Sequence, residues 1–325
     1  MIKCVKCNTQ LPDEAKFCFK CGFPVGVLEV CRSCSECGNT LSAVDKFCSQ
    51  CGLPVKVIKT EGENQQTQDV PKVQLGKTPK MVLVPGGQFV MGGGSNGLVT
   101  LVSFHMSECL ITQKQFSYVM GRNPSKLVGD DRPVECVNWC EAIIYCNTLS
   151  AMSGLTPCYS IGPTTDLSKF EATSPVWKRI VCNFTANGFR LPTEAEWEFA
   201  AREGKSLNTN IYSGSSNINA VAWYGENSGI TTHNVATKEP NSLKLYDMCG
   251  NVAEWCWDYY SATLASGSQT NPHGPTMGEM HVKRGGSWLD DPQQCTVFYR
   301  SGSAPNGKSS SLGFRICRSE VSQTI

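Results

Sequence analysis

The sequence predicts an irregular α+β body with few helices, preceded by two small cysteine-rich modules. Nine of the 19 cysteines lie in the first 51 residues of this 325-residue chain. From Lys80 onward, short apolar runs with β-forming residues replace a polar stretch. Beyond about residue 205, apolar runs become brief and alternate with turn-forming residues, so few long elements are expected there.

Charge and hydropathy narrow the classes of partner. The net charge is +1 and charged residues make up 18% of the chain, so no large single-sign field directs the whole molecule to nucleic acid or an anionic membrane. No apolar run has the length of about 18 residues that a membrane helix needs. The N-terminus lacks the pattern of a signal peptide. These features predict a cytoplasmic protein without a membrane partner.

The N-terminal cysteines form a repeat. Two segments, starting at Cys4 and Cys34, each hold Cys-x2-Cys, ten residues, and Cys-x2-Cys-Gly. Four thiolates in two such pairs can enclose a tetrahedral zinc ion, whose binding energy folds a segment too short to bury a core. The predicted ligands are Cys4, Cys7, Cys18 and Cys21 in the first module, and Cys34, Cys37, Cys48 and Cys51 in the second.

Alternatives remain for these cysteines. A disulfide framework is one, although reduced thiols are the rule in the predicted compartment. Cys31 could replace Cys34, because "CRSC" has the same spacing, but the repeat favours Cys34. The modules resemble bacterial zinc ribbons, and sites with four thiolates offer no open position for catalysis. A structural role or docking of a protein partner is expected, since few aromatic residues and balanced charge give little support to nucleic-acid binding.

The domain boundaries follow from these changes in composition. The modules are predicted at residues 1–29 and 30–55, a flexible linker at 56–77, and the body at 78–320. The linker is polar and follows neither helical nor strand periodicity.

Local signals place the regular elements of the body. "MVLVPGGQFVMGG" predicts two short strands around a Pro-Gly-Gly turn, from Met81. Thr112 is a predicted helix cap. "WCEAIIYCNTLSAMSG" predicts a helix from Trp139 that ends at Gly154. Thr193 and Glu196 form a capping-box pattern for a helix that ends before Gly204.

Six motifs in the body carry a resemblance. They are "MVLVPGGQFVMG", "PVECVNWCEAIIYCN", "NGFRLPTEAEWEFAAREG", "LYDMCGNVAEWCWDYY", "RGGSW" and "LGFRICR". In this order they resemble the formylglycine-generating (sulfatase-modifying factor) domain family, over about residues 78–320. The resemblance implies a C-type-lectin-like fold with a largely antiparallel sheet core and two main helices.

In that setting several large side chains are expected to be structural. Buried indole N–H groups would bond backbone carbonyls, and buried arginines would bind loop carbonyls or a carboxylate such as Glu194 or Glu196. The residues concerned are Trp139, Trp197, Trp255, Trp257, Trp288, Arg190, Arg284 and Arg315.

The resemblance also implies a calcium site in "CGNVAEW". By position, Cys249 and Val252 would supply carbonyl oxygens, and Asn251 and Glu254 would supply side-chain oxygens, which suit a hard cation. The alternative is that Asn251 and Glu254 only hydrogen-bond the loop. A second calcium site of the family is not carried over, because Ala236 stands where an acidic residue is expected.

The redox chemistry of the family is incomplete here. Its sulfatase-activating members use two cysteines five residues apart, which hold copper(I). At these positions the chain has Asp290 and Cys295. Cys295 is therefore the catalytic candidate if the chain is an oxidase, but a buried, unreactive thiol is the favoured interpretation.

The segment between "RGGSW" and "LGFR" is the candidate binding surface. It is rich in small, polar and aromatic residues, as adaptable binding loops are. The arrangement resembles the variable proteins of diversity-generating retroelements, and an ordinary solvated loop is the alternative. The resemblance points to Leu289, Asp290, Asp291, Thr296, Phe298, Ser301, Gly302, Ser303, Gly307, Ser309 and Ser310.

The leading hypothesis is a non-catalytic protein that binds a protein or other macromolecular ligand through this surface. The competing hypothesis is a copper- or iron-dependent oxidase of cysteine thiols. In a third, the zinc ribbons are the working part and dock the body to a partner.

Overall fold

The computed structural model describes residues 78–94, 97–204 and 210–320, together with four short strands nearer the N-terminus. The chain divides into two units, Met1–Gln68 and Asp69–Ile325, which are described separately. The eight predicted zinc ligands and the predicted linker at 56–77 lie outside the described residues.

The first unit repeats a small antiparallel strand pair. β1 (Ile2–Lys3) pairs with β2 (Gln10–Leu11), and β3 (Arg32–Ser33) pairs with β4 (Thr40–Leu41). The registers Ile2↔Leu11 and Arg32↔Leu41 differ by the same offset of 30 residues as the cysteine repeat. In each pair, the Cys-x2-Cys starts directly after the first strand, at Cys4 and at Cys34. The repeat in backbone structure thus aligns Cys34, and not Cys31, with Cys4.

Three helices of the body begin where the sequence predicts, and a fourth, of a single turn, was not predicted. They are α1 (Gln113–Met120), α2 (Trp139–Met152), α3 (Glu194–Ala201) and the single turn α4 (Ile218–Val221). Thr112, Asn138 and Thr193 cap the first three, each in a reciprocal capping box. The 3-10 turns are η1 (Met91–Gly93), η2 (Pro175–Arg179) and η3 (Pro292–Cys295).

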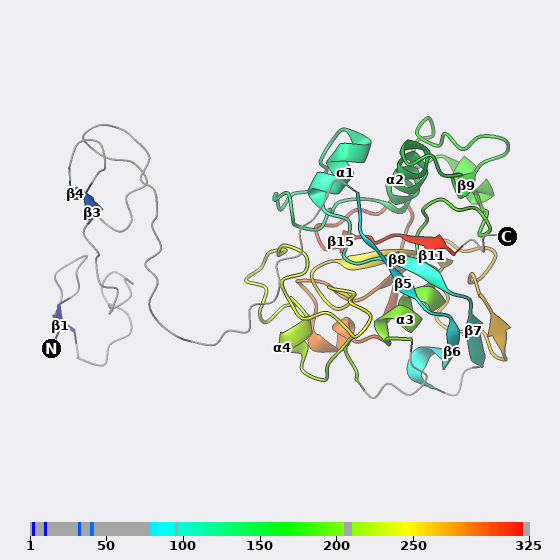
Figure 1. The fold of residues 1–325 in the computed structure, drawn as a ribbon. Coiled ribbons are helices and arrows are strands. Elements are labelled where there is room, and N and C mark those ends of the chain that lie inside the picture. The colour runs from blue at the N-terminus through cyan, green and yellow to red at the C-terminus, as the bar shows by residue number, and fades with distance from the viewer. Residues whose placement is uncertain are drawn as a thin grey trace. The chain divides into compact units, whose positions relative to one another are not determined.

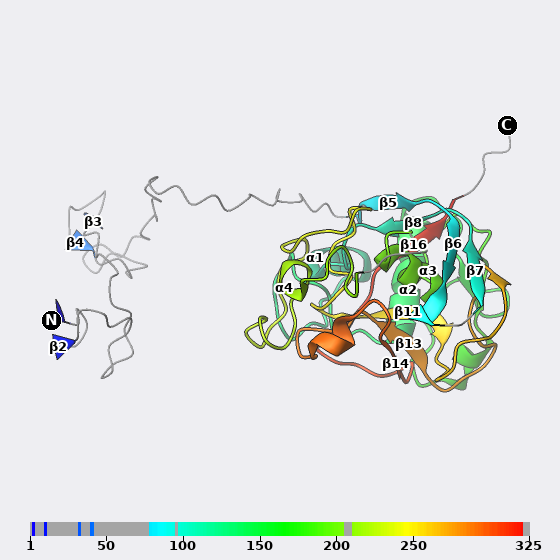
Figure 2. The ribbon, with the colours of Figure 1, turned by 90° about the horizontal axis from the view of Figure 1, so that it is seen from below.

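The strands form small, mostly antiparallel sheets (Figures 1 and 2). The sheet that matters most here has the order β14-β13-β11-β15, in which β11 (Ala253–Tyr259) is central and β14 (Arg300–Ser303) is an edge strand. β13 is His281–Arg284 and β15 is Leu312–Gly313. The other sheets contain β5 (Met81–Val84), β8 (Phe104–Ser107) and β16 (Cys317–Ser319); β6 (Gly87–Val90), β7 (Leu98–Leu101) and β12 (Gln269–Thr270); and β9 (Tyr159–Ser160) with β10 (Val181–Cys182).

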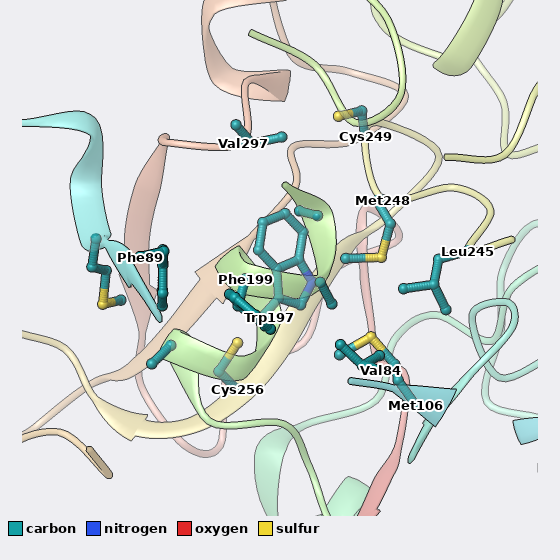
Figure 3. Packing of buried hydrophobic residues seen from close by; sticks show 14 of the residues in the cluster. Val84, Phe89, Met106, Trp197, Phe199, Leu245, Met248, Cys249, Cys256 and Val297 are labelled. Atoms are coloured by element: carbon teal, nitrogen blue, oxygen red, sulfur yellow. The ribbon is translucent and has the colours of Figure 1, made fainter. Parts of the chain in front are cut away.

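One core cluster includes residues of α3 together with Cys295 and Val297. Trp197 and Phe199 of α3 pack there with Val84, Met106, Cys256 and Val297, from strands and loops far apart in the sequence (Figure 3). A second cluster gathers around α2, with Trp139, Tyr145 and Phe314. The apolar residues of α2 that recur at helical spacing are all buried: Trp139, Ala142, Ile143, Cys146 and Leu149.

Three of the five indole groups expected to bond backbone carbonyls do so, whereas Trp197 Nε1 donates to the Glu254 carboxylate at 2.8 Å. Trp139 Nε1 donates to the Cys256 carbonyl at 3.0 Å, and Trp255 Nε1 donates to the Val137 carbonyl at 2.9 Å. Trp288 Nε1 donates to the Ser310 carbonyl at 2.9 Å. The first bond joins α2 to β11, and the other two hold loop residues that belong to no strand.

Buried arginines pair with carboxylates. Arg190 binds both oxygens of Glu196 at 2.6 Å. Arg284 binds Glu198, and Arg315 binds Glu254, with both partners of each pair 0% exposed in their side chains. Each pair satisfies charges that burial would otherwise penalise. Among the described residues, no helix is long and apolar enough to span a membrane.

Candidate ligand-binding surface

The segment of residues 289–311 (the C-terminal segment) runs between two buried anchors. At its start, Trp288 is 7% exposed, its N–H donates to the Asn251 carbonyl, and its carbonyl accepts from Ser228 Oγ at 2.8 Å. At its end, Leu312 belongs to β15 in the main sheet. The two ends are therefore held by the core, and the residues between them form loops, η3 and the edge strand β14 (Figure 2).

Two glycines form the turn that precedes this segment. Gly285 and Gly286 have φ values of 91° and 68°, a region that favours glycine. A Cβ at Gly286 would lie 2.6 Å from the Gln294 carbonyl oxygen and 2.7 Å from Cys295 Sγ. The turn thus packs directly against η3, which fixes the start of the segment.

Arginines anchor the middle of the segment. Arg300 donates Nε and Nη2 to the two oxygens of Glu194, at 2.5 and 2.7 Å, and Nη1 to the Ser261 carbonyl at 3.0 Å. Arg284 Nη1 donates to the Tyr299 carbonyl. Val297 is 1% exposed, and its N–H donates to the Ile211 carbonyl at 3.0 Å. The segment is therefore held at Val297, Tyr299 and Arg300.

Each predicted contact residue is at least partly exposed. Leu289 and Asp291 are exposed, with Leu289 at 54%. Nine are partly buried: Asp290, Thr296, Phe298, Ser301, Gly302, Ser303, Gly307, Ser309 and Ser310. Three of these, Ser301, Gly302 and Ser303, lie together on β14.

Three of the predicted positions also have a structural task. A Cβ at Gly302 would lie 2.8 Å from Tyr260 Cγ, and one at Gly307 would lie 2.6 Å from Ser303 Oγ. Phe298 packs against the core cluster, and the Arg202 guanidinium lies 5.2 Å from its ring centroid. Substitution at these positions therefore disturbs the framework. Asp291 also has a local task, because it is the N-cap of η3 and its N–H donates to Gln294 Oε1 at 3.3 Å.

Asp290 and Cys295 do not form a pair of thiolate ligands for a metal ion, because one is a carboxylate and the other a buried thiol. Asp290 Oδ2 accepts a hydrogen bond from Ser287 Oγ at 2.6 Å, and its carbonyl accepts from the Gly225 N–H at 2.9 Å. Cys295 is 0% exposed. Burial, with Cys249 and Asp290 as further causes, raises the pKa of Cys295 far above its ordinary value. Copper(I) prefers thiolates, so a buried neutral thiol beside a carboxylate is a poor fit for it.

Cys249 is a neighbour that the sequence did not reveal. It comes 46 residues before Cys295, shares its core cluster, and is close enough to raise its pKa. Burial raises the pKa of Cys249 itself to about 12, and its Sγ accepts from the Ser213 N–H at 3.2 Å. Both groups are therefore held as thiols. Within the residues that the structure describes, no group of three or more His, Cys, Asp or Glu side chains could hold a metal ion.

The residues implied as calcium ligands are engaged by protein groups. Glu254 is 0% exposed; its Oε2 accepts from Arg315 Nε at 2.7 Å and Trp197 Nε1 at 2.8 Å, and its Oε1 accepts from Arg315 Nη2 at 2.9 Å. Asn251 Oδ1 accepts from the His233 N–H, and its Nδ2 donates to Asp247. The Arg315 guanidinium takes the place of a cation at Glu254, and the Asn251 oxygen is already bonded to the His233 N–H, so these side chains do not fit calcium.

Comparisons with known proteins match both parts of the chain. The Sulfatase-modifying factor enzyme 1-like domain matches residues 66–320, and the Double zinc ribbon matches residues 4–52. "Chaperone protein LppX" of Paenibacillus barcinonensis is 36% identical over 260 residues, which cover 74% of this chain and 89% of that protein. A formylglycine-generating enzyme of Thermomonospora curvata is 28% identical over 300 residues, 76% of this chain and 96% of the enzyme.

Solved structures share the fold. Treponema denticola variable protein 1 has a TM-score of 0.68 and 36% identity, covering 74% of this chain and 95% of its own. CarF has a TM-score of 0.60 and 28% identity, covering 75% of this chain and 99% of its own. The matched family model, the order of motifs and the mixed α+β body agree. The chain therefore belongs to the family of sulfatase-modifying factor enzyme 1-like domains, with a double zinc ribbon ahead of that domain.

Proposed function

We propose that this chain is a non-catalytic ligand-binding protein, whose C-terminal segment meets a protein or other macromolecular partner. One observation carries the proposal: the family framework is intact around the segment, while Asp290 stands at the first position of the family's cysteine pair and Cys295, at the second, is 0% exposed. A thiol with a raised pKa and no exposure is a poor nucleophile and a poor soft-metal ligand.

The relatives support a binding role. Treponema denticola variable protein 1 is named as a variable protein, and the relative from Paenibacillus barcinonensis is named as a chaperone. Neither name describes an oxidase. We extend the first likeness to propose that the C-terminal segment of this chain is the diversified target of a retroelement, with fixed anchors at Trp288, Arg300 and Leu312.

The zinc ribbons complete the proposal. We assign Cys4, Cys7, Cys18 and Cys21 to one zinc ion and Cys34, Cys37, Cys48 and Cys51 to the other. The match to a double zinc ribbon and the equal offset of strands and cysteines support this assignment. Closed four-thiolate sites suit the docking of a protein partner and not catalysis.

Site-specific photocrosslinking tests the binding surface. A photoreactive amino acid replaces Leu289, which is 54% exposed, and in a matched variant it replaces Val102, which is 63% exposed and lies outside the C-terminal segment. In the cells that express the chain, Leu289 is expected to give a discrete crosslinked partner that Val102 does not give. Equal crosslinking from both positions, or none from Leu289, would contradict the proposal.

The alternative function is a copper- or iron-dependent oxidase of cysteine thiols. The likeness to formylglycine-generating enzymes favours it, and Cys249 offers a second thiol close to Cys295. Cys295 would then be the catalytic residue. Turnover with a cysteine-containing sulfatase peptide is the result that would establish this alternative.

A further inference from the structure

A cavity of about 570 Å³ with a mixed polar and apolar wall lies beside the start of α3, and none of the proposed contact residues lines it. Its volume falls within the range of about 300–1,000 Å³ typical of small-ligand sites. Four elements supply its wall: η1, the first turn of α3, the end of β11 and the loop of residues 261–275. Arg300 of β14 closes one side.

Asp258 gives the cavity its distinctive chemistry. Its side chain belongs to the wall although the residue is only 4% exposed, and Oδ2 accepts from the Glu194 N–H at 2.9 Å. A Cβ at Gly274 would lie 2.8 Å from Asp258 Oδ1, and Gly274 has a φ of 75°. Only glycine lets this turn approach the carboxyl so closely.

The charges around the cavity leave Asp258 without a cation. Glu194 is bound by Arg300 through both oxygens, and Arg284 Nε lies 3.4 Å from Glu194 Oε1. Glu196 and Glu198 have their own arginines. Within the described part of the chain, the Asp258 carboxylate forms no ion pair with a Lys, Arg or His. Burial and then Glu194 raise the pKa of Asp258 well above its ordinary value, as expected for a carboxyl that lacks a positive partner.

The rest of the wall suits an aliphatic stem. Met91, Leu264, Pro272 and Pro275 supply apolar surface. Arg300 faces the cavity as one half of an ion pair, because both oxygens of Glu194 accept from it. Burial lowers the pKa of His273, so that ring stays uncharged at neutral pH.

We infer that this cavity binds an amphipathic cation, a primary ammonium or guanidinium on a short aliphatic stem, whose charged end pairs with Asp258. The cation can be a free amine or the side chain of a lysine or arginine in a peptide. This inference does not rest on the proposed function of the C-terminal segment.

Calorimetric titration of the full chain tests the inference. The probes are 1,5-diaminopentane, agmatine and the peptide acetyl-Ala-Lys-Ala-amide; n-hexanol and hexanoate are the neutral and anionic controls. Saturable binding is expected from the cations and not from the controls. Tighter binding of the peptide assigns the source to a protein side chain, tighter binding of the free amines assigns it to a small molecule, and either supports the inference.

Two variants place the ligand. Asp258→Asn keeps the size of the side chain and an acceptor for the Glu194 N–H, and it is expected to weaken cation binding about tenfold to a hundredfold. Asp166→Asn makes the same change at an exposed carboxylate and is expected to leave binding unchanged. Ala265→Arg places a cation at the exposed rim of the cavity and is expected to abolish binding without altering the core. Unchanged affinity in Asp258→Asn and Ala265→Arg, or no saturable binding of any cation, would overturn the inference.

Discussion

Replacing Arg315 by leucine would remove the guanidinium that neutralises Glu254 in the centre of the body. Both side chains are 0% exposed, and Arg315 makes two bonds to Glu254, of 2.7 and 2.9 Å. It also donates to the carbonyls of Ser107 and Tyr246, at 3.1 and 2.8 Å. Leucine would leave Glu254 with Trp197 Nε1 as its remaining donor among the described residues.

The expected loss follows from these contacts. An uncompensated buried charge costs about 3–5 kcal/mol, and each carbonyl that loses its donor adds about 1 kcal/mol. The free energy of unfolding of Arg315→Leu should therefore fall by about 5–7 kcal/mol, a large part of the about 5–15 kcal/mol typical of a domain. Urea unfolding followed by tryptophan fluorescence measures it. Arg179→Leu, at an exposed arginine, is the control, with a change within about 0.5 kcal/mol.

A second substitution tests the cause. In the double variant Glu254→Gln/Arg315→Leu the buried charge is gone, so the double variant should be more stable than Arg315→Leu alone, by about 2–3 kcal/mol. Burial already raises the pKa of Glu254 while Arg315 lowers it, so Arg315→Leu should raise that pKa further. The loss of stability should then shrink at low pH, where the carboxyl is protonated in both states. A double variant no more stable than Arg315→Leu would refute the reasoning.

Three further predictions concern other sites. Without a bound cation, the folded chain keeps a proton on Asp258 above the ordinary pKa of 3.8, so the stability that Asp258 contributes is lost as pH rises from 3.8 through the raised pKa; relative to the native chain, Asp258→Asn should gain stability with pH, by at most about 1.4 kcal/mol per unit in urea unfolding. Gly286→Ala should cost about 2–5 kcal/mol, because a Cβ meets Cys295 Sγ at a positive φ, whereas Gly229→Ala, in open space at a φ of 63°, should cost about 1–2 kcal/mol; equal losses would contradict this. Metal analysis should find two zinc ions per native chain, one in Cys34→Ser and two in Cys31→Ser. Two zinc ions in Cys34→Ser and one in Cys31→Ser would show that Cys31, and not Cys34, is the ligand.

The sequence predicted the helices of the body because their signals are local. Thr112 and Thr193 cap α1 and α3, and α2 begins at Trp139 as its pattern indicates. The pairing of the strands could not be predicted from the sequence in this way. β5 and β6 follow each other along the chain, yet β5 pairs with β8 and β6 pairs with β7. Such pairing depends on contacts between segments far apart, which no local pattern encodes.

In the candidate sites, too, the sequence predicted the features with local signals and missed those that depend on contacts between distant residues. The motifs located the C-terminal segment and its partly exposed residues, since anchors such as Trp288 lie next to them in the sequence. They did not reveal that Cys249 lies near Cys295, or that Glu194, Asp258 and Arg300 meet at one cavity. The calcium ligands implied by resemblance, Asn251 and Glu254, are committed to protein partners, which only the three-dimensional contacts with Asp247 and Arg315 make visible.

The central claim is that this family framework surrounds a site without the redox pair. The most direct test is incubation of the copper(I)-treated chain with oxygen and a cysteine-containing sulfatase peptide, with a formylglycine-generating enzyme as the positive control and Cys295→Ala as the matched variant. The account predicts no formylglycine aldehyde from either the chain or the variant by mass spectrometry. Aldehyde formed by the chain and lost in Cys295→Ala would contradict it.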